Sequence, residues 1–407
     1  MLDENFINEC ENELKNEFNK IDDLCKINSK KVIDAFHHNH ISESDLYGSL
    51  GYGYNDQGRD KIDKIFAEVM DSEDAIVRNQ LISGSHAINV ALSALLRPGD
   101  TLLSITGLTY DTLHEVIGIK DNNSSLMSYG IKYKMIDLID DDVDYDSIKK
   151  ELKNNIKVIH IQRSRGYSLR DSINNKKLEK VIKFIKKINK DTIIFVDNCY
   201  CELVEITSPC KLGADIIVGS LIKNLGAGIA TNGAYIAGKK VLVDLCAERL
   251  TLPGEGRDVG PSENANRKFL LGLFLSPSVI ASSLKTAILT SYALEKLGYK
   301  VSPKYNDKRC DIVQLVYLNT KEEVIKYATA IQESGAIDAH IKPIPAPMPG
   351  YDDEIIMASP SFTQGSSIEL SCDAPLRKPY VIFMQGSMTY EYGRLAVLNV
   401  IKSLTNK

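Results

Sequence analysis

The chain lacks the features that would place it with nucleic-acid-binding or membrane proteins. Its 49 basic and 54 acidic residues nearly cancel to a formal net charge of −5, and both signs are mixed along the 407 residues. Such a balance argues against a face that binds nucleic acid. The start, MLDENFINECENELKNEF, has no apolar signal region, and we find no run suited to spanning a membrane. We therefore expect neither nucleic acid nor a membrane among its partners.

The chain also lacks an ordered cysteine framework, any internal repeat and any low-complexity tract. Its eight cysteines are scattered, which is typical of a reduced, cytoplasmic setting. Three close histidines, His37, His38 and His40, fit no metal site well, and no nearby cysteine or carboxylate set completes one. Surface histidines explain them better, and the sequence predicts no metal centre.

The chain is long and apolar enough for two cores. It has 407 residues, 43% of them hydrophobic, and 26 glycines. Residues 1–46 have the charged, amphipathic pattern of an N-terminal helical arm. In residues 47–285 helix-like segments alternate with short apolar strands, such as DTLLSIT, KVIHIQRS, DTIIFVDNC and ADIIVGS. This alternation predicts an α/β fold, a mostly parallel sheet covered by helices. Residues 286–407 predict a connecting helix and a smaller α+β domain.

Three of the predicted strands end in polar groups. In open α/β sheets, ligands bind beyond the carboxyl ends of the strands. The stretch LISGSHAIN puts Gly84, Ser85 and His86 at a turn into a helix, where backbone N–H groups and a hydroxyl suit a phosphate. Asp197 ends the apolar run IIFVD, where a carboxylate is costly without a cationic partner.

The third strand end, ADIIVGSLIK, adds Ser220 and an isolated lysine, Lys223. Pyridoxal phosphate explains all three ends, because it needs an amine for a Schiff base, an anion opposite its ring nitrogen and donors for its phosphate. Asp197 precedes Lys223 by 26 residues, about one crossover, so adjacent strand ends can hold both groups. A solvated surface lysine and a helix-capping aspartate are the alternatives. Their joint placement with two Gly/Ser turns favours the cofactor.

Eight ordered stretches carry a family resemblance that runs from about residue 47 to the end. They are GYGYNDQGRDKI, SGSHAI, LTYDTLHEVIG, IQRSRGYSLRDSI, VDNCYCELVE, GSLIKNLGAGIA, LPGEGRDVGPS and QGSMTYEYGR. Together they resemble the aluminium-resistance proteins, a family similar to methionine γ-lyase and cystathionine β-lyase. The resemblance implies a transferase-like enzyme of fold type I that depends on pyridoxal phosphate.

The resemblance assigns roles to the residues at these strand ends. It makes Lys223 the Schiff-base lysine and Asp197 the partner of the pyridinium nitrogen. Gly84, Ser85 and Ser220, with the adjacent His86, would hold the phosphate. Tyr110 in LTYDTLHE would stack on the pyridine ring and serve as a catalytic acid; a core or surface tyrosine is the alternative.

The same resemblance implies a homodimer or homotetramer with shared active sites. Tyr54 lies thirty residues before Gly84 and is similar to the lyase tyrosine that reaches the phosphate of the neighbouring subunit. The lyases carry an arginine two positions later, whereas this chain has Asp56. Arg59 could compensate, and a simple turn tyrosine stays open as the other reading of Tyr54.

A substrate carboxylate calls for a bidentate cation. Arg377, in DAPLRKPY, lies where relatives place such an arginine, while Arg163 and Arg165 follow a core strand and compete for the role. A structural ion pair is the alternative for each. Cys199 and Cys201 are expected to be small packing residues.

We therefore expect a pyridoxal-phosphate-dependent carbon–sulfur lyase that acts on a sulfur amino acid. Elimination at Cβ or Cγ would release a thiol, ammonia and a 2-oxo acid, and elimination at Cβ is expected to be the faster. Another reaction of the same cofactor, such as amino-group transfer or aldol cleavage, is the alternative within enzymes. A non-enzymatic role in metal or stress binding is the alternative from another class.

Overall fold

A computed structural model describes residues 4–348 and 351–405 of the chain. The chain divides into two compact units that are interleaved in sequence. The large unit comprises Lys31–Leu221 and Asn232–Leu271, and the small unit comprises Met1–Lys30, Ile222–Thr231 and Gly272–Lys407. Compactness by itself does not define a domain that folds alone. The expected domains 1–46, 47–285 and 286–407 therefore stay a prediction.

The large unit contains a seven-stranded, mostly parallel sheet, as the α/β expectation requires. Its strand order is β1-β7-β6-β5-β4-β2-β3, and only the pairs that include β7 are antiparallel. The strands are β1 (Asp74–Arg78), β2 (Thr101–Ser104), β3 (Lys132–Met135), β4 (Ile156–Gln162), β5 (Ile193–Asp197), β6 (Ile216–Ser220) and β7 (Ala234–Gly238). Every residue of β5 and β6 is buried, which explains their continuous apolar runs.

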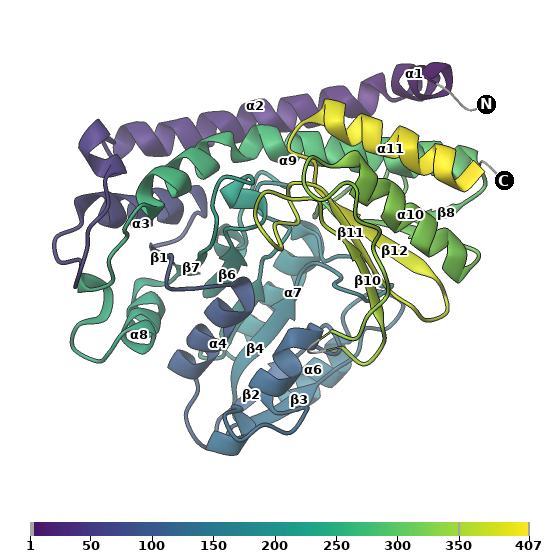
Figure 1. Cartoon of the computed structure of the whole chain (residues 1–407). Coiled ribbons are helices and arrows are strands. Elements are labelled where there is room, and N and C mark those ends of the chain that lie inside the picture. The colour runs from purple at the N-terminus through teal and green to yellow at the C-terminus, as the bar shows by residue number, and fades with distance from the viewer. Residues whose placement is uncertain (1–3, 349–350, 406–407) are drawn as a thin grey trace. The chain divides into compact units, whose positions relative to one another are not determined.

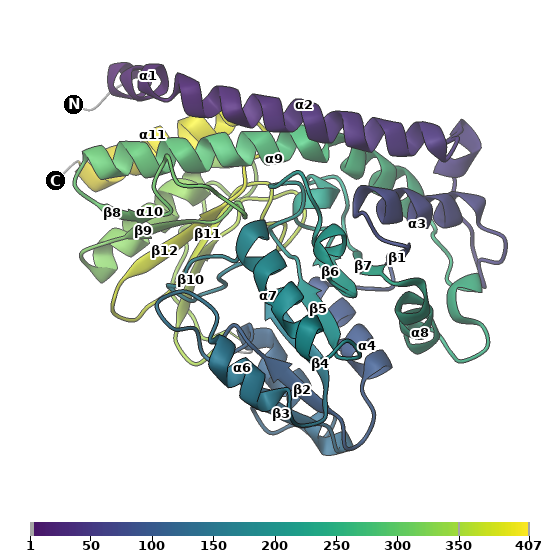
Figure 2. The same ribbon diagram turned by 180° about the vertical axis from the view of Figure 1, so that it is seen from behind.

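Helices cover both faces of this sheet. α4 (Gly84–Leu95) and α8 (Lys240–Leu250) lie on one face (Figure 1), and α6 (Tyr145–Glu151) and α7 (Asn175–Ile188) lie on the other (Figure 2). In α7 the buried residues Leu178, Val181, Ile182 and Ile185 recur at helical spacing, so one stripe faces the sheet. α3 (Gln57–Val69) packs against β1. This layering confirms the fold class, and it brings the carboxyl ends of β2, β4, β5 and β6 to one edge of the sheet.

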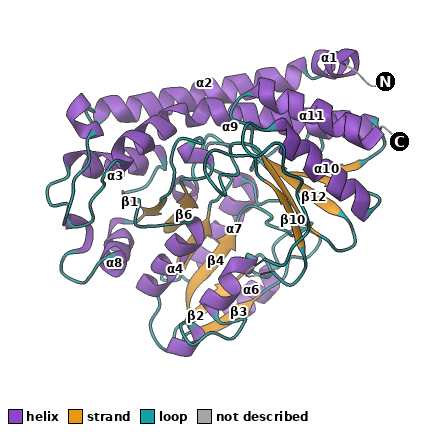
Figure 3. Ribbon diagram, viewed as in Figure 1, coloured by secondary structure: helices purple, strands orange, loops and turns teal. Residues whose placement is uncertain are grey.

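The small unit has an antiparallel sheet of five strands in the order β10-β11-β12-β9-β8 (Figure 3). The strands are β8 (Lys300–Ser302), β9 (Gln314–Tyr317), β10 (Ile355–Ala358), β11 (Ser371–Pro375) and β12 (Val381–Gln385). α10 (Lys321–Ser334) and α11 (Tyr390–Thr405) share one apolar core with this sheet. Ile7, Cys10 and Leu14 from the region of α1 (Glu4–Glu13) join the same core. The apolar stripe of the N-terminal arm is thus part of the small unit's core.

Two long helices run through both units along the chain, α2 (Lys15–His38) and α9 (Ala265–Lys296). Among the described residues, α9 is the one helix whose length and composition would suit a membrane span. Most of its apolar stretch is buried inside the protein. A buried core helix needs the same composition, so this finding is weak evidence for a membrane.

Candidate active site

The first turn of α4 lies against the ends of β5 and β6. Ser83 caps this helix, since its hydroxyl accepts a hydrogen bond from the backbone N–H of His86 at 3.1 Å. A Cβ at Gly84 would lie 3.2 Å from the Cys199 sulfur and 3.3 Å from the Ser220 Cβ. A larger residue at this position would need Cys199 or Ser220 to shift by a few tenths of an ångström, so glycine favours this close approach. The result is a helix N-terminus beside a hydroxyl, which is suited to a phosphate.

The two residues that follow Gly84 are held in different ways. Ser85 shares a 2.8 Å hydrogen bond with Thr112, so a second hydroxyl lies near the first turn of the helix. The His86 ring instead accepts a bond from the backbone N–H of Ile82 through Nδ1 at 3.3 Å. His86 thus stabilises the turn before the helix. Sequence reasoning missed Thr112, which a hydroxyl two residues after Tyr110 could have suggested.

Asp197 ends β5 in the same corner. One of its oxygens accepts the backbone N–H of Cys199 at 3.1 Å, and the residue is largely buried. In the sheet it lies opposite Gln162 of β4 and Val218 of β6. Paired residues of parallel strands point to the same face, so Gln162 and Asp197 are side-by-side polar groups at the strand ends.

His160, two residues before Gln162, shares that face and stacks on Phe195 with ring centroids 5.6 Å apart. Both of its ring nitrogens are buried and lack a hydrogen-bond partner among the described residues. Burial lowers the pKa of His160 to about 4, and the charge of Asp197 opposes this only in part. Sequence reasoning missed His160 and Gln162, although two polar residues at alternate positions of a buried strand were a signal.

Tyr110 lies after β2, at the start of a short helical turn, and is half-buried. Its ring centroid is 6.0 Å from that of Tyr167. Both this ring and Gln162 lie against Gly166, which has a positive φ of 56°: a Cβ there would be 3.2 Å from Tyr110 and 3.0 Å from the Gln162 nitrogen. The structure therefore brings Tyr110 and Gln162 together.

The two arginines after β4 have different surroundings. Arg163 is buried and donates to Asn198, Asn175 and Glu205 at 2.8–3.0 Å. This internal network engages the Arg163 guanidinium, which agrees with the alternative that Arg163 forms a structural ion pair. Arg165 is also buried, and it forms an ion pair with Asp171 at 3.7 Å.

Lys223 and Arg377 belong to the small unit, whereas the other predicted site residues belong to the large unit. Lys223 is half-buried and precedes a tight turn, in which its carbonyl accepts the Gly226 N–H at 3.2 Å. That turn packs on α9, since a Cβ at Gly272 would lie 2.6 Å from the Gly226 oxygen. Arg377 is exposed and pairs with Asp353 at 2.8 Å.

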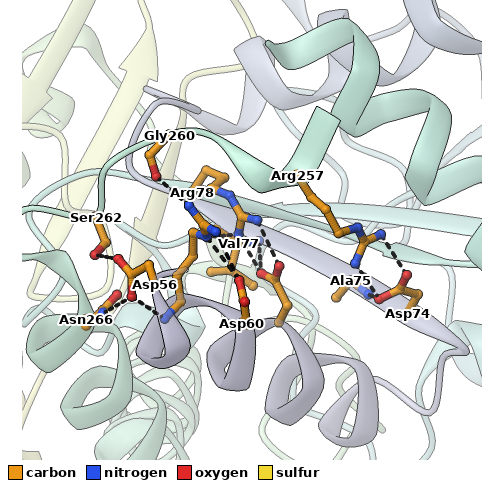
Figure 4. Close-up of polar contacts among 12 residues, drawn as sticks. Asp56, Asp60, Asp74, Ala75, Val77, Arg78, Arg257, Gly260, Ser262 and Asn266 are labelled. Carbon is orange, nitrogen blue, oxygen red and sulfur yellow. Dashed lines mark hydrogen bonds and ion pairs between the residues drawn. The ribbon is translucent and has the colours of Figure 1, made fainter. Parts of the chain in front are cut away.

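The segment before α3 contains Asp56, at the position where the resemblance leads us to expect an arginine. Asp56 caps α3 by accepting the backbone N–H of Arg59 at 2.9 Å, and it also accepts bonds from Ser262 and Asn266 (Figure 4). Burial opposes ionisation of Asp56, but these hydrogen bonds together lower the pKa of its carboxyl. The Arg59 guanidinium is buried and donates to the carbonyls of Gly53 and Gly260. Tyr54 is 54% exposed beside them.

These groups fit pyridoxal phosphate. The helix N-terminus and the Ser220 hydroxyl suit a phosphate dianion, and Asp197 at the next strand end suits a protonated ring nitrogen. Within residues 4–348 and 351–405, no three His, Cys, Asp or Glu side chains are grouped as a metal ion would need.

Known proteins resemble the chain over its whole length. The family model described as methionine gamma-lyase matches residues 3–405. A Bacillus subtilis protein, YnbB, of uncharacterised function, is 44% identical over 95% of this chain and 93% of its own length. A solved Listeria monocytogenes structure, named "putative cystathionine beta-lyase involved in aluminum resistance", is 44% identical, with a TM-score of 0.97 over 99% of this chain and 100% of that one.

A Clostridium novyi structure, named carbon-sulfur lyase involved in aluminum resistance, is 41% identical, with a TM-score of 0.93 over 98% of this chain and 94% of that one. Yeast cystathionine gamma-lyase, at 15% identity and a TM-score of 0.64, shares the fold alone over 93% of this chain and 98% of its own.

Proposed function

The chain belongs to the methionine gamma-lyase family, whose cofactor is pyridoxal phosphate, and we propose that it cleaves a carbon–sulfur bond in a sulfur amino acid. The observation that carries this proposal is the corner where α4 begins, with Gly84 against Ser220 and Asp197 at the adjacent strand end. A helix N-terminus beside a hydroxyl, which suits a phosphate, and a carboxylate, which suits a ring nitrogen, lie there within one unit.

In this proposal the first turn of α4, Ser85 and Ser220 bind the cofactor phosphate, and Asp197 faces the ring nitrogen. Lys223, three residues after Ser220, is the amine that binds the cofactor covalently. When bound, pyridoxal phosphate supplies an aldehyde carbon for amines and a ring that accepts the electron pair of the broken Cα–H bond.

The chain's own groups then move protons. The Lys223 amine would take the proton from Cα. Tyr110, beside Gln162 and Tyr167, gives a proton to the leaving sulfur. Arg377 is the preferred partner of the substrate carboxylate, and Arg165 is the second candidate.

We further propose that elimination at Cβ is faster than elimination at Cγ. A cysteine thioether and water would give a thiol, pyruvate and ammonium: RS–CH₂–CH(NH₃⁺)–COO⁻ + H₂O → RSH + CH₃–CO–COO⁻ + NH₄⁺. Elimination at Cγ also requires a proton to leave Cβ, so it needs more positioned acid–base groups. Position 56, where the resemblance implies an arginine, is a helix-capping aspartate in this chain. This difference supports a changed position of the phosphate, and with it a changed preference between Cβ and Cγ.

A cytoplasmic homodimer or homotetramer is part of the proposal, with Tyr54 reaching the phosphate of the neighbouring subunit. The exposure of Tyr54 is compatible with such a reach. Dilution that separates subunits should then release cofactor.

The test is to offer purified holoenzyme cysteine, cystathionine and methionine separately, and to resolve the 2-oxo acids by chromatography. Pyruvate from the first two in excess over 2-oxobutyrate from methionine is expected. Dominant 2-oxobutyrate from methionine would overturn the Cβ preference alone. A yellow, borohydride-reducible protein that does not release a 2-oxo acid together with ammonia would indicate amino-group transfer or aldol cleavage. A colourless protein would indicate a non-enzymatic binding role.

A further inference from the structure

His160 is a polar side chain at a position where the sheet otherwise buries apolar residues. It lies on β4 and is 1% exposed, and Val158, two residues earlier on the same face, belongs to an apolar core. Phe195, its partner on β5, stacks on the ring with the centroids 5.6 Å apart. An imidazole without hydrogen bonds is costly to bury in such a place. Packing alone therefore does not explain why a histidine is here.

The His160 ring has unused bonding capacity. Burial lowers its pKa to about 4, so the ring is neutral near neutral pH and has one N–H donor and one acceptor nitrogen. Neither nitrogen has a hydrogen-bond partner among the described residues. Ser104, which lies opposite His160 on β2, donates its hydroxyl to the Gly107 carbonyl at 2.7 Å. The hydroxyl hydrogen of Ser104 is thus engaged, and the ring N–H remains available to an acceptor.

The Asp197 carboxylate is an acceptor on the same face of the sheet. Asp197 lies two residues after Phe195 on β5, which makes it the diagonal neighbour of His160. Diagonal neighbours on paired strands are roughly 7–8 Å apart, a separation that an aromatic side chain can reach across. Among the described residues, Asp197 is the one whose charge acts on the His160 ring. Sheet register and electrostatics therefore both couple His160 to Asp197.

Asp197 can accept this bond, and Gln162 is the weaker competitor for it. One Asp197 oxygen accepts the Cys199 N–H at 3.1 Å, and a carboxylate can accept several hydrogens. Gln162 is paired directly with Asp197, and its side-chain oxygen is also buried without a partner in the part of the chain that the structure describes. That oxygen is neutral, whereas a hydrogen bond to a charged acceptor is roughly twice as strong. The His160 N–H should therefore prefer the carboxylate.

We propose that His160 is a positioning residue for Asp197: when the cofactor is bound, the ring N–H donates to the Asp197 carboxylate and holds it opposite the ring nitrogen of the cofactor. A neutral donor of this kind stabilises the ionised form of a carboxylate. Asp197 and the ring nitrogen share one proton, so stabilising the ionised carboxylate keeps that proton on the nitrogen, where the cofactor needs it to accept electrons. This inference rests on the proposed function, in which Asp197 faces that nitrogen.

The position of the shared proton is the direct readout. Pyridoxal phosphate labelled with nitrogen-15 in its ring has an NMR shift that reports whether this nitrogen carries the proton, independently of turnover. In His160→Phe the equilibrium should move about tenfold toward protonated Asp197, as the loss of one charge-assisted hydrogen bond predicts. His160→Gln, whose amide can still donate, should recover most of that change. An unchanged shift in His160→Phe with the cofactor bound would overturn the proposal and leave the lyase function intact.

Ser104→Ala is the matched control. Ser104 is as deeply buried as His160 and lies beside it on β2, but its hydroxyl bonds to the Gly107 carbonyl. Its replacement should leave the ring-nitrogen shift unchanged. Equal changes in Ser104→Ala and His160→Phe would mean that packing of the sheet sets the position of the proton, which contradicts a role of the imidazole. A colourless wild-type protein that binds no cofactor would overturn the proposed function itself.

The histidine ring gives a second readout, which needs no variant of His160 to be active. The chain has seven histidines, and comparison with His160→Gln identifies the signal of the His160 ring N–H among them. Addition of pyridoxal phosphate to the wild-type apoprotein should move this proton downfield, because its new acceptor is charged. The movement should be at least about twofold smaller in Asp197→Asn, whose amide oxygen is a neutral acceptor. A His160 signal that stays in place when the wild-type protein takes up the cofactor, or that moves equally in Asp197→Asn, would contradict the proposal.

Discussion

Two polar clusters of the large unit differ in how completely their groups are bonded. At the start of α3, Asp56 accepts bonds from Arg59, Ser49, Ser262 and Asn266 (Figure 4). At the ends of β4 and β5, the His160 nitrogens and the Gln162 oxygen are buried without partners among the described residues. Buried polar groups are normally satisfied within the fold. The first cluster therefore stabilises the fold, whereas the second has spare bonding capacity that a ligand can use.

The comparison predicts that substitutions near the strand ends alter chemistry and substitutions near α3 alter stability. Lys223→Ala should lower turnover by at least about 10⁴-fold, because it removes the side chain that we propose as both the covalent amine and the base. Borohydride should no longer fix the cofactor to the protein, while the free energy of unfolding stays near that of the wild type. A reducible adduct on another lysine would show that Lys223 is the wrong residue.

Asp197→Asn should keep the cofactor and lower kcat by roughly 10²–10³-fold, since a neutral amide cannot balance a positive ring nitrogen. The absorption of the bound cofactor across pH is a readout independent of turnover, and we expect its titration to move. Wild-type turnover together with an unchanged spectrum would assign the ring nitrogen to a different group.

Asp56→Ala should have the opposite profile. It leaves Ser262, Asn266 and the Arg59 N–H without an acceptor, so the free energy of unfolding should fall by about 2–4 kcal/mol. Urea denaturation measures this loss. Asp60→Ala on the same helix is the control, because Asp60 is an exposed ion-pair partner and should matter by less than about 0.5 kcal/mol. Similar losses in both variants would contradict the role of the bonded cluster.

His160 should make the fold sensitive to acid. Its folded pKa of about 4 is below the ordinary value of 6.5, so between these values the unfolded chain binds more protons. The neutral ring's contribution is present in full above pH 6.5 and declines, by roughly 3 kcal/mol at most, as the pH falls to 4. His160→Phe should flatten the stability curve over this range. Parallel curves for the two proteins would contradict it.

The smallest effect is expected from Tyr54→Phe. In the proposed oligomer Tyr54 reaches the phosphate of the neighbouring subunit, so loss of its hydroxyl should raise the cofactor dissociation constant roughly fivefold. Equilibrium dialysis measures that constant. Tyr52→Phe is the control, since Tyr52 is a more exposed neighbour at 73%. A change in both variants, or in neither, would favour a simple turn tyrosine.

Local sequence determined the elements and the positions of several polar groups. Continuous apolar runs predict β5 and β6, because strands buried on both faces need no alternation. The start of α4 also follows from local sequence, because a serine followed by glycine is typical of a helix N-terminus. Asp197 and Ser220 could therefore be placed at strand ends from the sequence.

Only the tertiary structure decided which polar groups are already bonded. Asp56 caps α3 through the nearby Arg59 N–H, but its other bonds form because Ser262 and Asn266, more than 200 residues later, fold against it. Arg163 is engaged because Glu205 lies beside it. His160 and Gln162 have spare capacity because their neighbours in the sheet offer no partner. Hydrogen bonds between distant segments depend on distances that residue spacing does not encode. The sequence by itself therefore determined where polar groups enter the fold, and long-range packing decided which of them stay available to a ligand.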